Sequence, residues 1–452
     1  MKTTGIIAEY NPLHNGHLYQ MQQARRLSGS DYVIVVMSPD FVQRGEPALL
    51  DKWVRARMAL EAGADLVLEM PVRYATGSAE HFAEGGVSVL DCLGVVDSLS
   101  FGCETGHTGF LMEYARFLSQ QETEEYRILL QKKLRKGISY AEARTLAWLE
   151  LRNKCNHPTE EDFISEKISD LLRSPNNILA VEYMKAVLKR GNRMKLFPVL
   201  RVGAQYHDLN IYHDCHTSDI PESTERKDTS GYNPTECETS SKLNYASASG
   251  IRNALSKGID VSDQMPPSAF RLLSEEMASG RYLTSSDLDL PLRLKLYEAR
   301  SSLTDYVDVN EDLANRINHL LPQYTGFDQF TALLKTKQVA HTRVRRALLH
   351  ILLEIRNTDA SNPSFARVLG FRKRALPLLS EIKEHSSIPM VTKLPPEDHT
   401  LSDKASERQT QQAQMRDSLR EDLRATELWE LLVSQKTGAP VRNERQRRIV
   451  IV

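Results

Sequence analysis

Cysteine is scarce in this sequence, with five among 452 residues. Cys92, Cys103, Cys155, Cys215 and Cys237 are too scattered for a disulfide framework or a metal site. No run reaches the roughly 18 apolar residues of a membrane span, and no charged-then-apolar leader opens the chain. These gaps exclude a membrane protein and predict a protein of the reducing cytoplasm.

Net charge is also nearly missing, because 58 Lys and Arg residues face 59 Asp and Glu residues. This balance excludes a globally basic nucleic-acid binder but allows a local basic patch. A hydrophobic content of 41% is enough for real cores, and 452 residues predict two or three domains. We expect boundaries that give domains 1–280, 281–400 and 401–452.

Short apolar segments alternate with amphipathic ones through the first 200 residues, which predicts a parallel sheet covered by helices on both faces. In such sheets ligands bind beyond the carboxyl ends of the strands. We therefore expect the turns 8–17, 38–46, 71–77 and 102–106 to gather at one edge. The predicted strands are 4–8, 31–37, 65–72, 95–101 and 194–202, and the predicted helices are 18–27, 47–62, 78–93 and 178–187.

The turn after the first strand carries two histidines. Asn11-Pro12 ends the strand, and His14 and His17 follow where a helix should begin. Helix N-termini favour phosphate, Gly16 lets a ligand approach the backbone, and two imidazoles on one helical turn would donate hydrogen bonds to a phosphate. A zinc site is the alternative, although no third ligand stands nearby at the required spacing.

The second half of the chain looks mainly helical and locally basic. Helical periodicity runs through 290–303, 309–321, 327–334, 343–355 and 375–383, and aromatic residues stand among the cations. Such clusters suit an RNA backbone, and a solvated helix face is the alternative. The candidate RNA-binding residues are Lys335, Lys337, Arg343, Arg345, Arg346, Arg372 and Lys373.

Three other segments have less distinct patterns. Residues 216–241 are polar and predict a flexible excursion, and residues 401–452 predict a polar linker, a short helix and a basic tail. A His- and Asp-containing stretch, 207–216, suggests a zinc site, a general base or a solvated strand end.

Two distant motifs resemble those of one enzyme superfamily. His14-Asn15-Gly16-His17 resembles the HxGH signature with which nucleotidyltransferases bind ATP, and SASGIR at 247–252 resembles their late Ser-Ser-x-Ile-Arg element. The fold that this resemblance implies is a Rossmann-like nucleotidyltransferase domain followed by a mainly α-helical domain. We assign His14 and His17 to the charge that develops on the phosphate, and Arg252 to the leaving phosphates.

The wider context is similar to the bacterial tRNA(Met) cytidine acetate ligase family. The matching stretches are EYNPLHNGH at 9–17, DFVQRGEP at 40–47, DKW at 51–53, FG at 101–102, SPNNIL at 174–179 and RVG at 201–203. Leu13 stands where that family usually has phenylalanine, and Gly250 interrupts the late motif. The resemblance implies that ATP is bound by Ile7, Ala8, Glu9, Tyr10, Asn11, Pro12, Leu13, His14, Asn15, Gly16, His17, Leu18, Tyr19, Gln20, Gly102, Asn176 and Arg201.

Members of that family activate acetate with ATP and pass the acetyl group to the wobble cytidine of elongator tRNA(Met), which gives N4-acetylcytidine. The resemblance therefore implies ATP, acetate and this tRNA as substrates, with Mg²⁺ carried by the triphosphate. Two alternatives remain open. One is an adenylyltransferase acting on a small phosphorylated cofactor precursor, and the other is a non-catalytic tRNA-binding protein. The sequence leaves the oligomeric state open.

Overall fold

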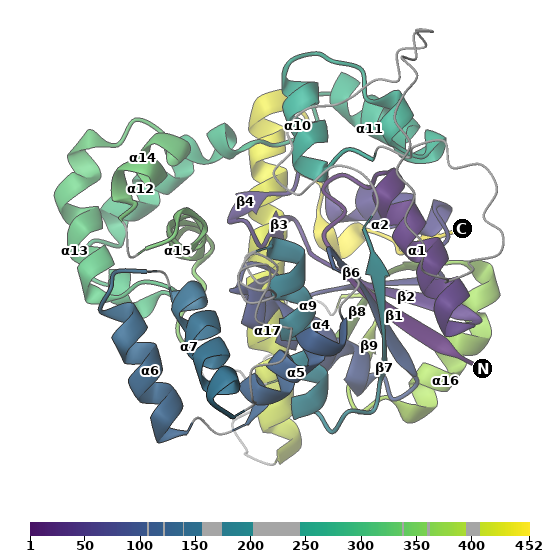
Figure 1. Cartoon of the computed structure of the whole chain (residues 1–452). Coiled ribbons are helices and arrows are strands. Elements are labelled where there is room, and N and C mark those ends of the chain that lie inside the picture. The colour runs from purple at the N-terminus through teal and green to yellow at the C-terminus, as the bar shows by residue number, and fades with distance from the viewer. Residues whose placement is uncertain are drawn as a thin grey trace, which may run out of the picture.

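The computed structural model describes residues 1–105, 108–120, 123–138, 140–155, 174–201, 245–336, 339–358, 362–394 and 407–452. Within this part of the chain, one sheet has eight strands, seven of them in the order β10-β8-β5-β2-β1-β6-β7, with β9 beside β8 (Figure 1). Its strands are β1 (Thr3–Ala8), β2 (Tyr32–Met37), β5 (Leu66–Glu69), β6 (Ser98–Cys103), β7 (Lys195–Leu200), β8 (Ala366–Phe371), β9 (Met390–Val391) and β10 (Val450–Ile451).

The five strands β5, β2, β1, β6 and β7 are parallel, as predicted. Successive residues point to opposite faces, so Ile6 and Ile7 belong to different hydrophobic cores. One core holds α1 (Asn15–Ser28), α2 (Lys52–Glu61), α10 (Ala248–Ser256) and α11 (Pro267–Ala278). The other holds α4 (Ala79–Cys92), α5 (Thr108–Ser119) and α9 (Pro175–Lys189).

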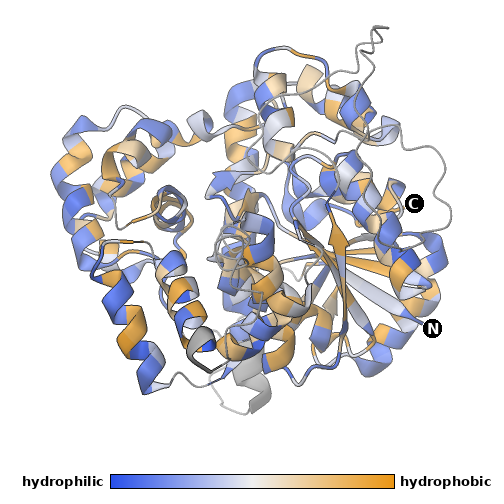
Figure 2. Cartoon of the chain, viewed as in Figure 1, coloured by the Kyte–Doolittle hydropathy of each residue, from blue (hydrophilic) through white to orange (hydrophobic). Residues whose placement is uncertain are grey.

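Hydrophobic residues concentrate in the strands and on the inner faces of these helices, while the outer helix faces are hydrophilic (Figure 2). Close contact between layers depends on small residues. A Cβ added at Gly86 of α4 would lie 2.6 Å from Cδ1 of Ile7. Helices therefore pack closely on both faces of the sheet. This arrangement confirms the expected α/β class.

A second group of helices builds its own core around Phe327, Phe330 and Tyr306. This group contains α12 (Asp289–Glu298), α13 (Glu311–Leu320), α14 (Phe327–Leu334) and α15 (His341–Leu353). In Figure 1 it lies on the opposite side of α17 (Glu407–Thr437) from the sheet, near α6 (Glu124–Leu134) and α7 (Tyr140–Cys155). No described helix has the length and apolarity that a membrane crossing requires.

The region expected to be mainly helical also contributes a sheet strand. Strand β8 runs antiparallel to β5, and all its residues are buried. Arg367 in this strand is buried, and its Nη1 lies 3.1 Å from Glu69 while its Nη2 lies 2.5 Å from Glu444. These partners, distant in sequence, neutralise the guanidinium and let the strand be buried. After β8, α16 (Leu376–His385) packs back onto the sheet.

The C-terminal region is not the linker, short helix and basic tail that we expected. Helix α17 has 31 residues, and its Trp429 is fully buried and donates from Nε1 to the carbonyl of Ala48 (3.1 Å). The basic residue Arg447 lies 3.0 Å from Asp51, and the chain then enters the sheet as β10. The segment has many charged residues and a single tryptophan, so its sequence looks polar. Its charges are paired in the fold, and the segment packs as part of the core.

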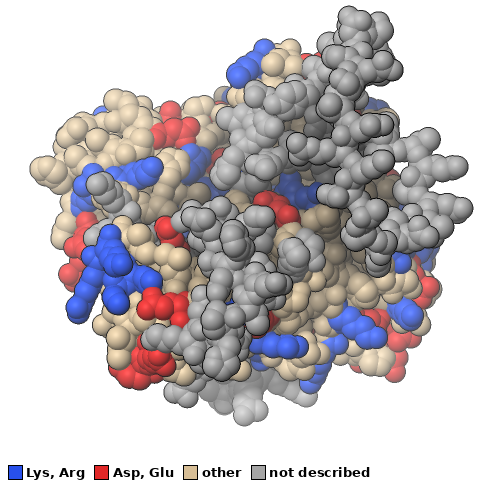
Figure 3. All heavy atoms as spheres, in the orientation of Figure 1, with Lys and Arg blue, Asp and Glu red and all other residues tan. Residues whose placement is uncertain are grey.

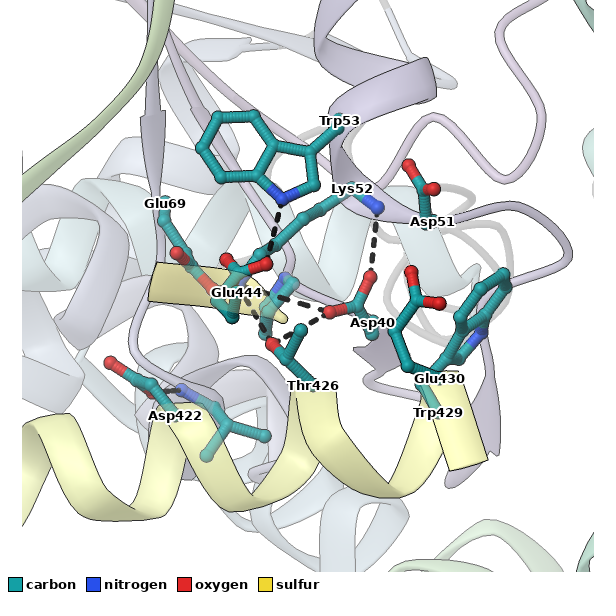
Figure 4. A network of polar contacts seen from close by, with 12 residues as sticks. Asp40, Asp51, Lys52, Trp53, Glu69, Asp422, Thr426, Trp429, Glu430 and Glu444 are labelled. Carbon is teal, nitrogen blue, oxygen red and sulfur yellow. Dashed lines mark hydrogen bonds and ion pairs between the residues drawn. The ribbon is translucent and has the colours of Figure 1, made fainter. Parts of the chain in front are cut away.

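Lys52, at the start of α2, lies in a buried network that joins these distant segments (Figure 4). Its side chain is inaccessible to solvent, and its Nζ lies 2.6 Å from Glu69 and 3.0 Å from Glu444. Nζ also donates to the hydroxyl of Thr426 in α17 (2.8 Å). Trp53 donates from Nε1 to Glu444 (2.9 Å). Lys52 is therefore a structural cation that fastens α17 and the C-terminal segment to α2.

Candidate active site

A cavity of about 190 Å³ opens at the carboxyl edge of the parallel strands. It is lined by the ends of β1, β6 and β7 and by the first turns of α1, α9 and α10, as expected for a parallel sheet. Its lining residues are Ile7, Ala8, Glu9, Tyr10, Asn11, His14, Gly16, His17, Tyr19, Gln20, Gln43, Arg44, Phe82, Phe101, Gly102, Asn176, Leu179, Tyr183, Val199, Leu200, Arg201, Tyr245, Ala246, Ser247, Ala248, Ser249 and Arg252.

The two histidines cap helix α1 with their own rings. The backbone N–H of Gly16 donates to Nδ1 of His14 (3.1 Å), and the backbone N–H of His14 donates to Nδ1 of His17 (3.3 Å). A Cβ at Gly16 would lie 2.9 Å from Cε1 of His14, so glycine keeps this ring in place. Since each Nδ1 accepts a hydrogen bond, each neutral ring carries its proton on Nε2. Both rings line the cavity as hydrogen-bond donors.

Burial keeps both rings neutral. It lowers the pKa of His14 well below its usual range, with the neighbouring His17 and Arg201 acting in the same direction. Burial, with Arg201 again assisting, lowers the pKa of His17 to about 3. The site therefore offers neutral donors to an incoming phosphate instead of a pair of imidazolium cations.

This neutrality predicts a loss of stability in acid. Unfolded histidine titrates near pH 6.5, so between that pH and the folded pKa the unfolded state binds the additional proton, and the free energy of unfolding falls as pH falls. His17→Gln should reduce this slope by up to one proton, about 1.4 kcal/mol per pH unit. Urea unfolding of the ligand-free protein at pH 5, 6 and 7 measures the difference, and identical slopes would contradict a neutral buried His17.

Arg252 reaches the cavity from α10, as the late motif predicted. It donates from Nη1 to the carbonyl of Asn11 (2.7 Å) and from Nη2 to Glu46 (2.7 Å). Glu46 belongs to the hairpin of β3 (Phe41–Val42) and β4 (Glu46–Pro47). In the same hairpin turn, Arg44 donates to the hydroxyl of Ser249 (2.8 Å). The hairpin therefore holds α10 over the cavity and adds a second arginine to it.

Glu9 follows the last residue of β1 and is the single acidic side chain among the described residues that line the cavity. Its Oε1 accepts the backbone N–H of Gln43 (2.9 Å). Burial raises its pKa, while the Gln43 N–H and the charge of Arg44 oppose the rise. The cavity thus combines two neutral histidines, three arginines and one carboxyl group.

The opposite wall contains the remaining predicted residues. Gly102 is the next-to-last residue of β6, and among the described residues a Cβ there would meet the side chain of Arg201, at 3.6 Å. Asn176, in the first turn of α9, donates to Glu104, and the backbone N–H of Glu104 donates to Asn177 (2.8 Å). These bonds fix α9 beside the end of β6, so both walls are positioned by the sheet.

Four residues of the predicted ATP loop lie outside the lining. Pro12 and Leu13 are buried beneath it, the Asn15 amide donates to the carbonyl of Asp263 (2.8 Å), and Leu18 is only partly buried along α1. Several lining residues were missed, because aromatic and aliphatic side chains carry no local signal of a ligand. The rule that ligands bind at the carboxyl ends of parallel strands would have found Phe101, Val199 and Leu200. These missed residues are Gln43, Phe82, Phe101, Leu179, Tyr183, Val199, Leu200, Tyr245, Ala246 and Ala248.

The candidate tRNA-binding cations are not gathered on one surface. Arg345 is 8% exposed, contacts Asp328 and lies 3.4 Å from Glu46, so its charge is already paired. Arg346 lies 3.1 Å from Asp308. Lys335 and Arg343 are exposed at the ends of α14 and α15.

Arg372 and Lys373 lie elsewhere. They follow β8, whose last residue pairs with the first residue of β5, so they lie at the sheet edge opposite the cavity. Basic and acidic side chains are interspersed over the face in Figure 3. Lys337 and the stretches 207–216 and 216–241 lie outside the described residues.

A family model described as HIGH Nucleotidyl Transferase matches residues 1–220 and 212–444. The tRNA(Met) cytidine acetate ligase of Clostridium botulinum (strain Okra / Type B1) is 35% identical over 410 residues, covering 89% of this chain and 91% of the relative. The chain belongs to the tRNA(Met) cytidine acetate ligase family. The ligase of Caldanaerobacter subterraneus subsp. tengcongensis is 36% identical over 399 residues, covering 87% of this chain and 89% of the relative.

Two solved structures of a family member have the same fold. Thermotoga maritima TmcAL without ligand aligns over 100% of both chains, with a TM-score of 0.84 and 29% identity. The form bound with alpha-thio ATP aligns equally fully, with a TM-score of 0.81 and 28% identity. The resemblance predicted from the motifs is therefore confirmed as family membership.

Proposed function

We propose that this chain is an ATP-dependent acetate ligase of elongator tRNA(Met). It joins acetate to the AMP part of ATP, releases pyrophosphate, and transfers the acetyl group to N4 of the wobble cytidine. The observation that carries this proposal is the convergence of both superfamily motifs on one cavity, because His14, His17 and Arg252 all line it. A tRNA substrate would place the reaction in the cytoplasm.

The first step is attack of the acetate oxygen on the α-phosphorus, with the bond to the β-phosphate breaking. Charge on the phosphate oxygens is stabilised by Nε2–H of His14 and His17, which is worth most in a desolvated site. Arg252 would exchange its bond to Glu46 for the leaving phosphates. Gly102, Asn176 and Arg201 would hold the nucleoside and the acetate on the opposite wall.

Magnesium would enter with the triphosphate and supply charge neutralisation. Among the described residues, no group of three or more His, Cys, Asp and Glu side chains is placed to hold a metal ion. The phosphates and water would therefore provide most of its ligands.

One assay tests the proposal. Purified protein is incubated with ATP and radiolabelled acetate, with and without tRNA(Met). Acetate-dependent pyrophosphate release and label in tRNA are expected. ATP turnover without either result would favour a cofactor adenylyltransferase, and tRNA binding without any turnover would favour a non-catalytic protein.

We also propose that residues 1–280 provide the ATP site and that the helical part of 281–400 provides the tRNA contact. Glu46 links Arg345, near the start of α15, to Arg252 of the cavity. We propose that this end of the helical part lies on the cavity side and that its exposed cations, Lys335 and Arg343, contact the tRNA.

Reversing both charges, Lys335→Glu with Arg343→Glu, should weaken tRNA binding about tenfold and flatten its dependence on salt, because phosphate contacts are lost. Acetate-dependent ATP–pyrophosphate exchange should not change. The matched control is Arg372→Glu with Lys373→Glu at the far edge. If both double variants lost tRNA affinity equally, the tRNA contact could not be assigned to the cavity side.

A further inference from the structure

The proposed reaction leaves one proton without a named acceptor. When N4 of cytidine attacks the acetyl carbonyl carbon of acetyl-adenylate, a C–N bond forms and the C–O bond to AMP breaks. The electron pair of that bond leaves on the phosphate of AMP, and one N4 proton must be removed. The geometry of the cavity restricts which side chain can take it.

The two histidines are unsuited to this task. Each Nδ1 already accepts a backbone N–H, and each Nε2 therefore carries a proton and donates. Burial raises the pKa of Tyr10 and of Tyr183, so both phenols stay protonated. Arginine has no acceptor atom. Tyr19 and Tyr245 also line the cavity, but a phenol must lose its own proton before it can act as a base. Among the described lining residues, Glu9 carries the single carboxyl group and is therefore the best candidate to accept the proton.

We infer that Glu9 is the general base of acetyl transfer, an inference that rests on the proposed function. The hydrogen bond from Gln43 N–H occupies Oε1 and orients the carboxylate, which leaves Oε2 for the substrate amine. Glu9 lies directly between β1 and the histidine turn, so it would lie beside a phosphate held by His14 and His17.

The surrounding charges suit a base that works near neutral pH. Arg44, Glu46 and Arg252 face Glu9 from the hairpin and α10, and Tyr183 faces it from α9. Arg55 of α2 donates to its backbone carbonyl (2.7 Å). Burial raises the pKa of Glu9 from the usual carboxyl range, which brings the base closer to the working pH. After transfer, Glu9 passes the proton to solvent.

Glu9→Gln tests the inference, because its amide oxygen still accepts the Gln43 N–H but is not basic. Enzyme loaded with ATP and labelled acetate is mixed with excess tRNA(Met), and transfer is followed in a single turnover. Exchange of labelled pyrophosphate into ATP, dependent on acetate, is measured separately. Transfer should slow about 100-fold, and exchange should fall by a much smaller factor, because the glutamine amide keeps the contact to the Gln43 N–H. The surface variant Glu384→Gln is the matched control.

Glu9→Asp should retain part of the transfer rate, and the rise of that rate with pH, present in the wild type, should disappear in Glu9→Gln. Unchanged transfer in Glu9→Gln would overturn the inference. Equal loss of exchange and transfer in both variants, or exchange restored by added Mg²⁺, would also overturn it and assign Glu9 to nucleotide binding. If the wild type lacks acetate-dependent exchange or transfer, the proposed function itself fails, whatever the variants do.

Discussion

His17→Ala is expected to lower acetate-dependent ATP–pyrophosphate exchange by about 100- to 1,000-fold, the usual cost of removing one donor to a developing oxyanion. Its Nε2–H is aimed into the cavity because Nδ1 accepts the His14 N–H. The tRNA affinity should stay within about twofold, since that contact is proposed on other helices.

The variant also loses one cap of helix α1, which costs about 1 kcal/mol of stability. Thermal unfolding should therefore show a folded protein. His319→Ala, an exposed histidine on α13, is the control and should keep wild-type exchange. If His17→Ala lost exchange and tRNA binding to the same extent, the two functions would not be divided between these parts of the chain.

Lys52→Met is expected to lower the free energy of unfolding by about 3–5 kcal/mol, because it removes one of the two buried cations that pair with Glu69 and Glu444 and leaves Arg367 alone with both. Glu69 and Glu444 are almost inaccessible and lie 2.6 and 3.0 Å from Nζ. Burial and Arg367 act to lower the pKa of Lys52, but the adjacent Glu444, Glu69 and Asp40 raise it overall, so Lys52 is charged at neutral pH.

Urea unfolding followed by circular dichroism measures this loss, and the exposed Lys257→Met serves as the control. The double variant Lys52→Met with Glu69→Gln should be less destabilised than the single one, because the excess buried negative charge is also removed and Arg367 still pairs with Glu444. A loss below about 1 kcal/mol in Lys52→Met would mean that the network adds little to stability.

The sequence predicted those parts of the site that depend on local chemistry. Proline before a histidine pair, glycine between them and an arginine in a late helix each have a physical reason near in sequence. The parallel strands could also be predicted from the sequence, because strands buried on both faces appear as short apolar runs. Helices 47–62 and 78–93 were placed within a few residues, apart from the start of α2.

The errors occurred where the environment of a residue depends on partners elsewhere in the chain, some of them about 300 positions away. Arg367 is a cation of the basic second half of the sequence, but Glu69 and Glu444 pair with it inside the fold. Arg345 was predicted to be a surface cation, but in the structure its charge is paired with Asp328 and Glu46. Charge pairing of this kind has no period in the sequence, so a buried arginine and an exposed one look alike.

The position of β8 has a consequence for synthesis of the chain. The outer edge of β5 is complete after residue 69, but its partner begins at residue 366. At typical ribosomal speeds this delay lasts about 15–60 s, during which an apolar strand has an open edge. Nascent chains that stop before β8 would retain that edge, and we expect such fragments to aggregate even though their ATP-binding motifs are complete.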